Sequence, residues 1–236
     1  MRILVFTKPA LPGHVKTRLV PPLTEVQAAE FHLASLDDVI AAVASAAAGE
    51  LRLRVAGQDS ELDEFRQRYP GVRIEAQSYG NLGDRLAAAF EEEFAGGGQC
   101  VVIIGSDHPT LPPEHIARGL DHLGSSDIVL GPSSDGGYYL VGIRHAAWPE
   151  ARAVFQEIPW STPQVLEASL EQALALGLSV TLLPEWYDVD RAEDLERLRA
   201  DASDDSAAAR LIIDWGILSP PPELGAGRDA PRGPIL

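Results

Sequence analysis

A short segment near the start of the sequence combines cations with glycine and proline, as a phosphate-binding loop requires. It runs from Thr7 to Leu19 and holds Lys8, Gly13, Lys16 and Arg18. An ammonium group acts on phosphate as a point charge, a guanidinium offers two parallel donors, and glycine lets backbone amides come close. The segment therefore predicts a site for a di- or triphosphate, with a solvated basic loop as the alternative.

Two carboxylates in later segments could hold a metal ion. Asp107 follows the apolar run Cys100 to Ile104, and Asp190 lies two residues after Asp188. Carboxylates of this kind bind a Mg²⁺ or Mn²⁺ ion that bridges the phosphate oxygens of a nucleotide. We expect Asp107 and Asp190 to be such ligands, although either could instead be the N-cap of the helix that follows it.

A glycine-rich turn carries a third carboxylate next to two tyrosines. Asp135 precedes Gly136, Gly137, Tyr138 and Tyr139. Asp-Gly-Gly is also a good hairpin turn, so a purely conformational role is the alternative. Because the turn follows a predicted strand, as the other candidate segments do, we expect Asp135 to act as a base or to bind an acceptor.

Alternating strands and helices would carry these segments. Apolar or alternating runs predict strands, and apolar residues at helical spacing predict helices. The predicted strands are Arg2 to Phe6, Leu51 to Ala56, Val72 to Ala76, Cys100 to Ile104, Asp127 to Leu130, Gly137 to Ile143 and Ser179 to Leu183. The predicted helices are Thr24 to Ala48, Ser60 to Tyr69, Leu82 to Phe94, Pro113 to Leu123, Thr162 to Leu176 and Ala192 to Leu198.

This alternation predicts an α/β fold, a three-layer α/β/α sandwich with a mostly parallel sheet. Functional groups in such folds gather beyond the carboxyl ends of the strands. The loops after Phe6, Ile104, Leu130 and Leu183 are therefore expected to meet at one edge of the sheet.

The composition limits the classes of partner and compartment. The chain has 236 residues, and we expect a single domain over residues 1–215 followed by a disordered Pro/Gly-rich tail over 216–236. Its net charge of -16 argues against nucleic acid and anionic membranes as partners. The single cysteine, Cys100, excludes an internal disulfide, and no apolar stretch of about 18 residues is present, so we expect a cytoplasmic protein. No Gly-x-Ser-x-Gly or HExxH motif occurs.

Five segments resemble, in order, the motifs of a bacterial family in the nucleotide-diphospho-sugar transferase (GT-A) superfamily. This family is labelled an arsenosugar-biosynthesis-type glycosyltransferase and is related to phospholactate and molybdenum-cofactor guanylyltransferases. The resemblance extends from Arg2 to about Leu198. The segments that carry it are Phe6 to Leu19, Gly80 to Leu86, Ile104 to Pro109, Gly131 to Leu140 and Ile158 to Thr162.

The resemblance implies a role for each matching residue. Phosphates would be bound by Lys8, Gly13, Lys16 and Arg18, and the nucleotide pocket would be lined by Gly83 and Arg85. Asp107 and Asp190 would hold the metal ion. The acceptor would face Gly136, Gly137, Tyr138, Tyr139, Trp160, Ser161 and Thr162. Most GT-A glycosyltransferases carry Asp-x-Asp where this chain has Ser106-Asp107-His108, with a single carboxylate.

Three functions follow as hypotheses. The first is a glycosyltransferase that uses a nucleotide sugar and a small-molecule acceptor, with Lys16, Arg18 and Asp135 as catalytic residues. The second is a guanylyltransferase-like nucleotidyltransferase that uses a nucleoside triphosphate and releases pyrophosphate. The third is a nucleotide-binding protein without catalytic activity, which the single carboxylate at Asp107 suggests.

Overall fold

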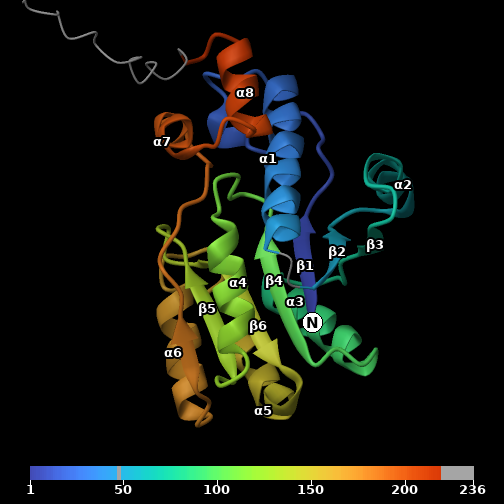
Figure 1. Ribbon diagram of the computed structural model, residues 1–236, viewed down its shortest axis with the longest axis vertical. Coiled ribbons are helices and arrows are strands. Elements are labelled where there is room, and N and C mark those ends of the chain that lie inside the picture. The colour runs from blue at the N-terminus through green and yellow to red at the C-terminus, as the bar shows by residue number, and fades with distance from the viewer. Residues whose placement is uncertain (47–48, 219–236) are drawn as a thin grey trace, which may run out of the picture.

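A computed structural model of the chain describes residues 1–46 and 49–218 (Figure 1). The strands of this part form one seven-stranded sheet in the order β3-β2-β1-β4-β6-β5-β7. They are β1 (Arg2–Thr7), β2 (Glu50–Val55), β3 (Arg73–Ala76), β4 (Cys100–Gly105), β5 (Ile128–Pro132), β6 (Tyr138–Arg144) and β7 (Val180–Leu182).

The sheet is mostly parallel, as the sequence predicts. Only β6, in the described chain, runs against its neighbours β4 and β5. The register pairs Phe6 with Gly105, so β1 and β4 end at the same level. The loops that follow them therefore start side by side.

Helices cover both faces of the sheet, which confirms the three-layer prediction. One apolar cluster joins α1, α2 and α4 to the sheet through residues such as Val39, Phe65 and Ile116. A second cluster joins α3, α5 and α6 to the opposite face through Phe90, Trp148 and Ala173. The helices are α1 (Glu25–Ser45), α2 (Asp59–Arg68), α3 (Leu82–Ala95), α4 (Pro113–His122), α5 (Trp148–Ala151), α6 (Val165–Ala175), α7 (Asp194–Asp201) and α8 (Ala207–Asp214), with 3₁₀ turns η1 (Thr17–Leu19), η2 (His145–Ala147) and η3 (Arg152–Phe155).

A third apolar cluster lies beyond the carboxyl ends of the strands. It packs η1, the first half of α1, α7 and α8 against one another through Leu19, Phe31, Leu198 and Ile212. Figure 1 shows α7 and α8 at this end of the molecule. The segment Thr7 to Leu19 therefore rests on helices from the C-terminal part of the chain.

The sequence analysis did not predict α8. Its signal is nevertheless present, because Ser206 accepts a hydrogen bond from the Ala209 amide as an N-cap and an Ala-rich run follows. The predicted tail starts at residue 216, but the amides of Gly216 and Ile217 still donate to Ile213 and Ile212 of α8. Residues 219–236 lie outside the described part. None of the described helices is long and apolar enough to span a membrane.

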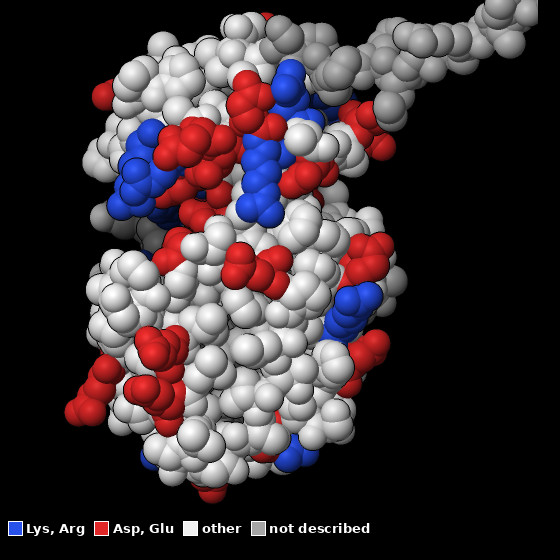
Figure 2. All heavy atoms as spheres, turned by 90° about the vertical axis from the view of Figure 1, so that its left-hand side faces the viewer, with Lys and Arg blue, Asp and Glu red and all other residues white. Residues whose placement is uncertain are grey.

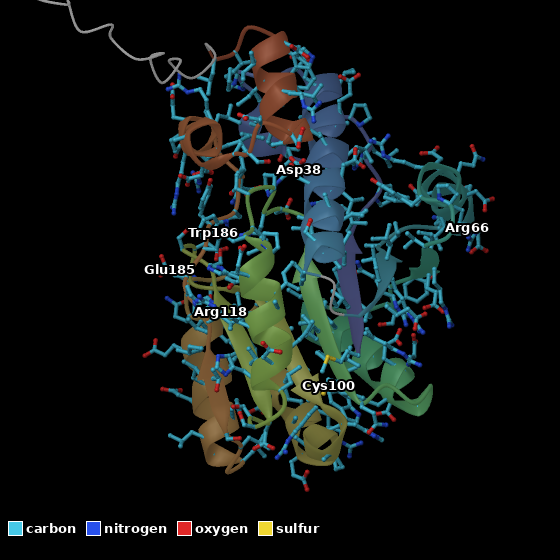
Figure 3. The ribbon with its side chains drawn as sticks, viewed as in Figure 1. Asp38, Arg66, Cys100, Arg118, Glu185 and Trp186 are labelled. Atoms are coloured by element: carbon cyan, nitrogen blue, oxygen red, sulfur yellow. The ribbon has the colours of Figure 1, made fainter. Side chains whose placement is uncertain are left out.

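Asp38 of α1 holds the start of α8. Its carboxylate accepts hydrogen bonds from Ser206 Oγ at 2.8 Å and from the amides of Ala207 and Ala208 at 2.7 and 3.0 Å. Figure 3 shows Asp38 between the two helices. We expect Asp38→Ala to lower the free energy of unfolding by about 1–3 kcal/mol, because three donors lose their acceptor. Urea unfolding measures this, with exposed Glu30→Ala of α1 as the control; equal effects of the two variants would contradict it.

Candidate active site

The carboxyl ends of β1, β4 and β5 open into a cleft of about 630 Å³. Its walls come from the loops after these strands, from the segment before α6 and from the segment between β7 and α7. The lining residues are Arg18, Leu82, Gly105, Asp107, His108, Ser133, Asp135, Gly137, Tyr138, Trp160, Ser161, Thr162, Pro163, Val165, Asp188, Asp190 and Arg191. Figure 2 shows acidic and basic side chains crowded on the upper half of one face, while the lower half is largely uncharged.

Lys16 is not a lining residue but lies behind the cleft wall, where it joins three loops through Asp107 and Asp190, which do line the cleft. Its backbone is left-handed, with φ 48° and ψ 34°, and the residue is 5% exposed. The Nζ atom donates to the Val189 carbonyl at 2.7 Å and lies 2.5 Å from Asp107 Oδ1 and 3.8 Å from Asp190 Oδ1. Burial alone would raise the pKa of Asp107, but the nearby Lys16 ammonium outweighs burial and holds that pKa below its usual range.

Arg18 and Asp194 hold Asp190 in place. Arg18 Nη1 lies 3.1 Å from Asp190 Oδ2. Asp194 Oδ2 accepts hydrogen bonds from the amides of Asp190 and Arg191 at 3.0 and 2.7 Å. Asp190 is therefore not the N-cap of the following helix, which begins at Asp194 and not at the predicted residue 192.

Asp107 is not a helix cap either, because Pro112 occupies the N-cap position of α4. Asp107 and Asp190 instead approach the same ammonium group from two loops. In residues 1–46 and 49–218 no group of three or more metal-binding side chains occurs. Mg²⁺ at nucleotide sites commonly takes one or two protein carboxylates and completes its shell with phosphate and water. The Asp107 and Asp190 pair fits an ion of that kind.

His108 presents one ring nitrogen to the cleft. The residue is 6% exposed, and Nδ1 lies 3.0 Å from the Tyr187 carbonyl. A carbonyl only accepts, so Nδ1 carries the hydrogen. Burial lowers the pKa of His108, which favours the neutral ring. Nε2 is therefore a hydrogen-bond acceptor, and no partner for it occurs in the described chain.

Asp135 and Asp188 lie on the side of the cleft formed by the β5–β6 turn. Asp135 Oδ1 accepts from the Gly137 amide at 2.9 Å, and Ser133 Oγ faces Asp188 Oδ1 at 3.5 Å. Gly136 has φ +88°, and a Cβ there would lie 2.1 Å from the Pro163 carbonyl oxygen, so the turn admits only glycine. Burial, and then the like charge of Asp135, raise the pKa of Asp188.

Aromatic rings form the remaining wall. Tyr138 and Trp160 meet edge to face, with centroids 6.4 Å apart and planes at 82°. Gly83 does not line the cleft as predicted but lies under Trp160, since a Cβ at Gly83 would be 2.7 Å from the indole Nε1. Its role is to let Trp160 approach α3.

Tyr139, predicted to face an acceptor, does not line the cleft. Successive strand residues point to opposite faces of a sheet, so Tyr138 reaches the cleft while Tyr139 enters the core. Tyr139 is 1% exposed and its hydroxyl contacts His115 Nδ1 at 3.2 Å and the Pro184 carbonyl at 3.1 Å. Burial raises the pKa of Tyr139 accordingly.

Four more predicted phosphate or nucleotide residues, Lys8, Gly13, Lys16 and Arg85, also lie outside the cleft lining. Of these, Lys16 contacts the lining residues Asp107 and Asp190. The Lys8 side chain is exposed, and its carbonyl accepts from His32 Nε2 at 3.1 Å. Gly13 lies against Glu25, and Arg85 Nε donates to the Gly80 carbonyl at 3.0 Å. The loop after β1 bends back over α1, so only its second half, Lys16 to Arg18, reaches the site.

The sequence analysis did not assign roles to His108, Ser133, Asp188 and Arg191, which line the cleft. Each is one or two residues from a predicted site residue. Asp188 could have been found, because residues two apart in extended chain share a side and Asp190 was already a candidate. The other three carry no such signal.

Comparisons with known proteins agree with this fold. Residues 39–162 match a family described as an uncharacterised protein conserved in bacteria (DUF2064). A provisionally assigned nucleotide-diphospho-sugar transferase of Desulfovibrio desulfuricans G20 is 30% identical, with a TM-score of 0.84 over 92% of this chain and 95% of that chain. A search of curated proteins gave no match.

More distant structures share the fold alone. A 4-diphosphocytidyl-2C-methyl-D-erythritol synthase is 11% identical, with a TM-score of 0.57 over 86% of this chain and 99% of that chain. A cytidylyltransferase of Leptospira borgpetersenii is 12% identical, with a TM-score of 0.56 over 91% and 94%. The resemblance to the arsenosugar-type group stays a prediction. The chain belongs to the bacterial DUF2064 family and has the fold of the nucleotide-diphospho-sugar transferases.

Proposed function

We propose that the protein is a glycosyltransferase that takes a nucleotide-diphospho-sugar donor and a small-molecule acceptor. The observation that carries this is the meeting of Lys16, Arg18, Asp107 and Asp190 at one end of a cleft whose other end is aromatic. The charged end suits a diphosphate, and the Tyr138 and Trp160 rings suit an apolar face of a sugar or acceptor. The similarity to the Desulfovibrio protein supports the donor class.

In the proposed reaction an acceptor hydroxyl attacks the anomeric carbon of the donor sugar. The bond from that carbon to the diphosphate oxygen breaks, and the oxygen leaves with the electron pair. Asp135 takes the hydroxyl proton, since one carboxylate oxygen is held by the Gly137 amide and the other is open. Lys16 and Arg18 stabilise the charge that develops on the diphosphate. A divalent ion held by Asp107 and Asp190 would supply further neutralisation of that charge.

Nucleotidyl transfer is the second candidate, because the fold is shared with cytidylyltransferases and the same cations suit a triphosphate. Product analysis separates the two. The protein is incubated with Mn²⁺ and a panel of nucleoside triphosphates and nucleotide sugars, and released pyrophosphate and nucleoside diphosphate are measured. Diphosphate release from a nucleotide sugar supports our proposal, and pyrophosphate release from a triphosphate refutes it. Binding without release in either case would favour the inactive nucleotide-binding protein.

Metal removal is expected to weaken nucleotide binding. Four carboxylates line the cleft, so a diphosphate enters against their charge unless a cation accompanies it. After treatment with EDTA, the increase in melting temperature caused by the bound nucleotide should fall to less than half of its value with Mg²⁺ present. Thermal shift with and without added Mg²⁺ measures this. Asp107→Asn should remove the metal effect, and a nucleotide shift that is insensitive to EDTA would exclude the proposed ion.

A further inference from the structure

Two of the four cleft carboxylates have no cation beside them. Asp107 lies 2.5 Å from Lys16, and Asp190 lies 3.1 Å from Arg18. Asp135 and Asp188 have no Lys or Arg partner within 4.0 Å anywhere in residues 1–46 and 49–218, and what they contact is the Gly137 amide and the Ser133 hydroxyl. Asp188 is half-buried, and a half-buried carboxylate without a counter-ion is unfavourable, the more so with the like charge of the exposed Asp135 nearby. This side of the cleft therefore favours a ligand that brings positive charge.

An independent observation indicates a ligand at the same place. His108 is nine-tenths buried and lines the cleft, and its Nε2 lies beside Gly105, another lining residue, with no hydrogen-bond partner in the described chain. Asp188 and His108 both line this cleft. The two carboxylates and the imidazole nitrogen offer acceptors only. A ligand bound here must supply the donors.

The aromatic wall indicates which kind of cation is bound. Tyr138 and Trp160 line the same cleft and meet edge to face. Ring faces attract ammonium groups, and they are no ligands for Mg²⁺, which prefers oxygen. An organic ammonium group accounts for the carboxylates and the rings together.

We propose that this side of the cleft binds a small molecule that carries a protonated amine and hydroxyl groups, an amino sugar or amino alcohol. In the context of the proposed function, on which this assignment of a role rests, that molecule is the acceptor. Asp188 binds the ammonium group, and Asp135 adds negative charge nearby while its open oxygen takes the proton of the reacting hydroxyl. His108 Nε2 accepts a hydrogen bond from a hydroxyl or ammonium hydrogen, and the rings cover the carbon skeleton.

The test compares three related sugars on the full-length protein. Binding of D-glucosamine, D-glucose and N-acetyl-D-glucosamine is measured by calorimetry with EDTA present and no nucleotide. Only the first carries an ammonium group. It should bind at least about 10-fold more tightly than the other two, as expected of a charge-assisted hydrogen bond. If glucosamine binds no better than glucose, including no binding of either, the proposal is overturned.

A variant and a control connect the preference to this site. Asp188→Asn should abolish the preference for glucosamine. Glu185→Gln should leave it intact, because Glu185 is exposed, lies at the outer surface in Figure 3 and does not line the cleft. A preference that survives Asp188→Asn, or one lost equally in Glu185→Gln, would overturn the proposal. Folding of both variants is verified by thermal unfolding.

The outcome is separable from that of the proposed function. Glucosamine binding that depends on Asp188, in a protein that releases no nucleoside diphosphate, would refute the glycosyltransferase and keep the amine site. Release of nucleoside diphosphate from a nucleotide sugar, without any preference for glucosamine over glucose, would support the glycosyltransferase and refute the amine site. A metal ion is the other cation that could bind at Asp188, so the calorimetry is repeated with Mn²⁺ and no sugar. If the protein binds Mn²⁺, the Asp188→Asn variant does not, and neither binds glucosamine, the amine site is overturned.

Discussion

Lys16→Met should lower turnover with a nucleotide sugar by about 10²-fold or more, the size of effect seen when one preorganised electrostatic donor is removed. Lys16 is buried directly behind the cleft wall, and its Nζ lies 2.5 Å from Asp107 and 3.8 Å from Asp190, which line the cleft. Without it these two carboxylates lose the ammonium group that offsets their charge toward the diphosphate. The loss should appear in kcat as well as in kcat/KM, because the charge on the leaving group is greatest in the transition state.

The chain supplies a matched control. Lys8 lies in the same loop, is exposed and does not line the cleft, and no other lysine than Lys8 and Lys16 occurs in the sequence. Lys8→Met should therefore keep turnover within about 3-fold of the unmodified protein, since a surface charge at a distance is largely screened. Steady-state release of nucleoside diphosphate measures both variants at a temperature where each is folded. Equal turnover of Lys16→Met and the unmodified protein would remove Lys16 from the mechanism.

Glu93→Gln should lower the free energy of unfolding by about 3–5 kcal/mol, the cost of removing the charged partner at the centre of a buried ion-pair network. Glu93 of α3 has a side chain that is 1% exposed and pairs with Arg2, Arg52 and Arg54 at 2.9, 2.7 and 2.8 Å. These arginines come from β1 and β2, so one carboxylate ties α3 to two strands. Guanidinium denaturation of the two proteins gives the difference.

The neighbouring residue serves as the control. Glu92 contacts Arg54 as well, but its side chain is 55% exposed, so Glu92→Gln should cost about 1 kcal/mol or less. Burial alone would raise the pKa of Glu93, but Arg54 and Arg52 outweigh it and lower that pKa. The Glu93 contribution is thus present at neutral pH and lost as the pH falls below about 4.3, the pKa of an unfolded glutamate. The difference between Glu93→Gln and the unmodified protein should shrink over that range, and a constant difference would contradict the assignment.

The fold was predictable because its signals are local. The continuous apolar run of β4 and the helical spacing in α1 each depend on a few adjacent residues. The site was predictable only in part. Sequence order puts Lys16, Asp107, Asp135 and Asp190 after strands, and the structure brings them to one end of the sheet. Sequence order does not reveal that Lys16 is buried between two carboxylates, because their contact requires loops more than 80 residues apart in the chain to meet.

The errors have physical causes as well. Tyr138 and Tyr139 are adjacent and chemically alike, and only the pleat of β6 decides which of them reaches the cleft. Gly83 and Gly13 belong to motifs, and what the structure shows for them is local: a Cβ at Gly83 would lie 2.7 Å from Trp160 Nε1, and Gly13 has φ +78°. The sequence analysis chose Asp190 and not Asp188. What separates the two is that Asp188 has no Lys or Arg partner, and only the three-dimensional structure shows this.

The two sides of the cleft are anchored to different apolar clusters. Leu19, next to Arg18, and Val189, next to Asp190, belong to the cluster of α7 and α8, whereas Ile104 and Leu130, which lead into the Asp107 and Asp135 loops, are held by the sheet. The cluster of α7 and α8 is the smallest of the three and excludes the sheet. Local opening of that cluster would expose its amides to hydrogen exchange and part Lys16 from Asp107 while the sheet stayed folded. We therefore expect heating to abolish activity, through opening of the cluster of α7 and α8, before the sheet unfolds.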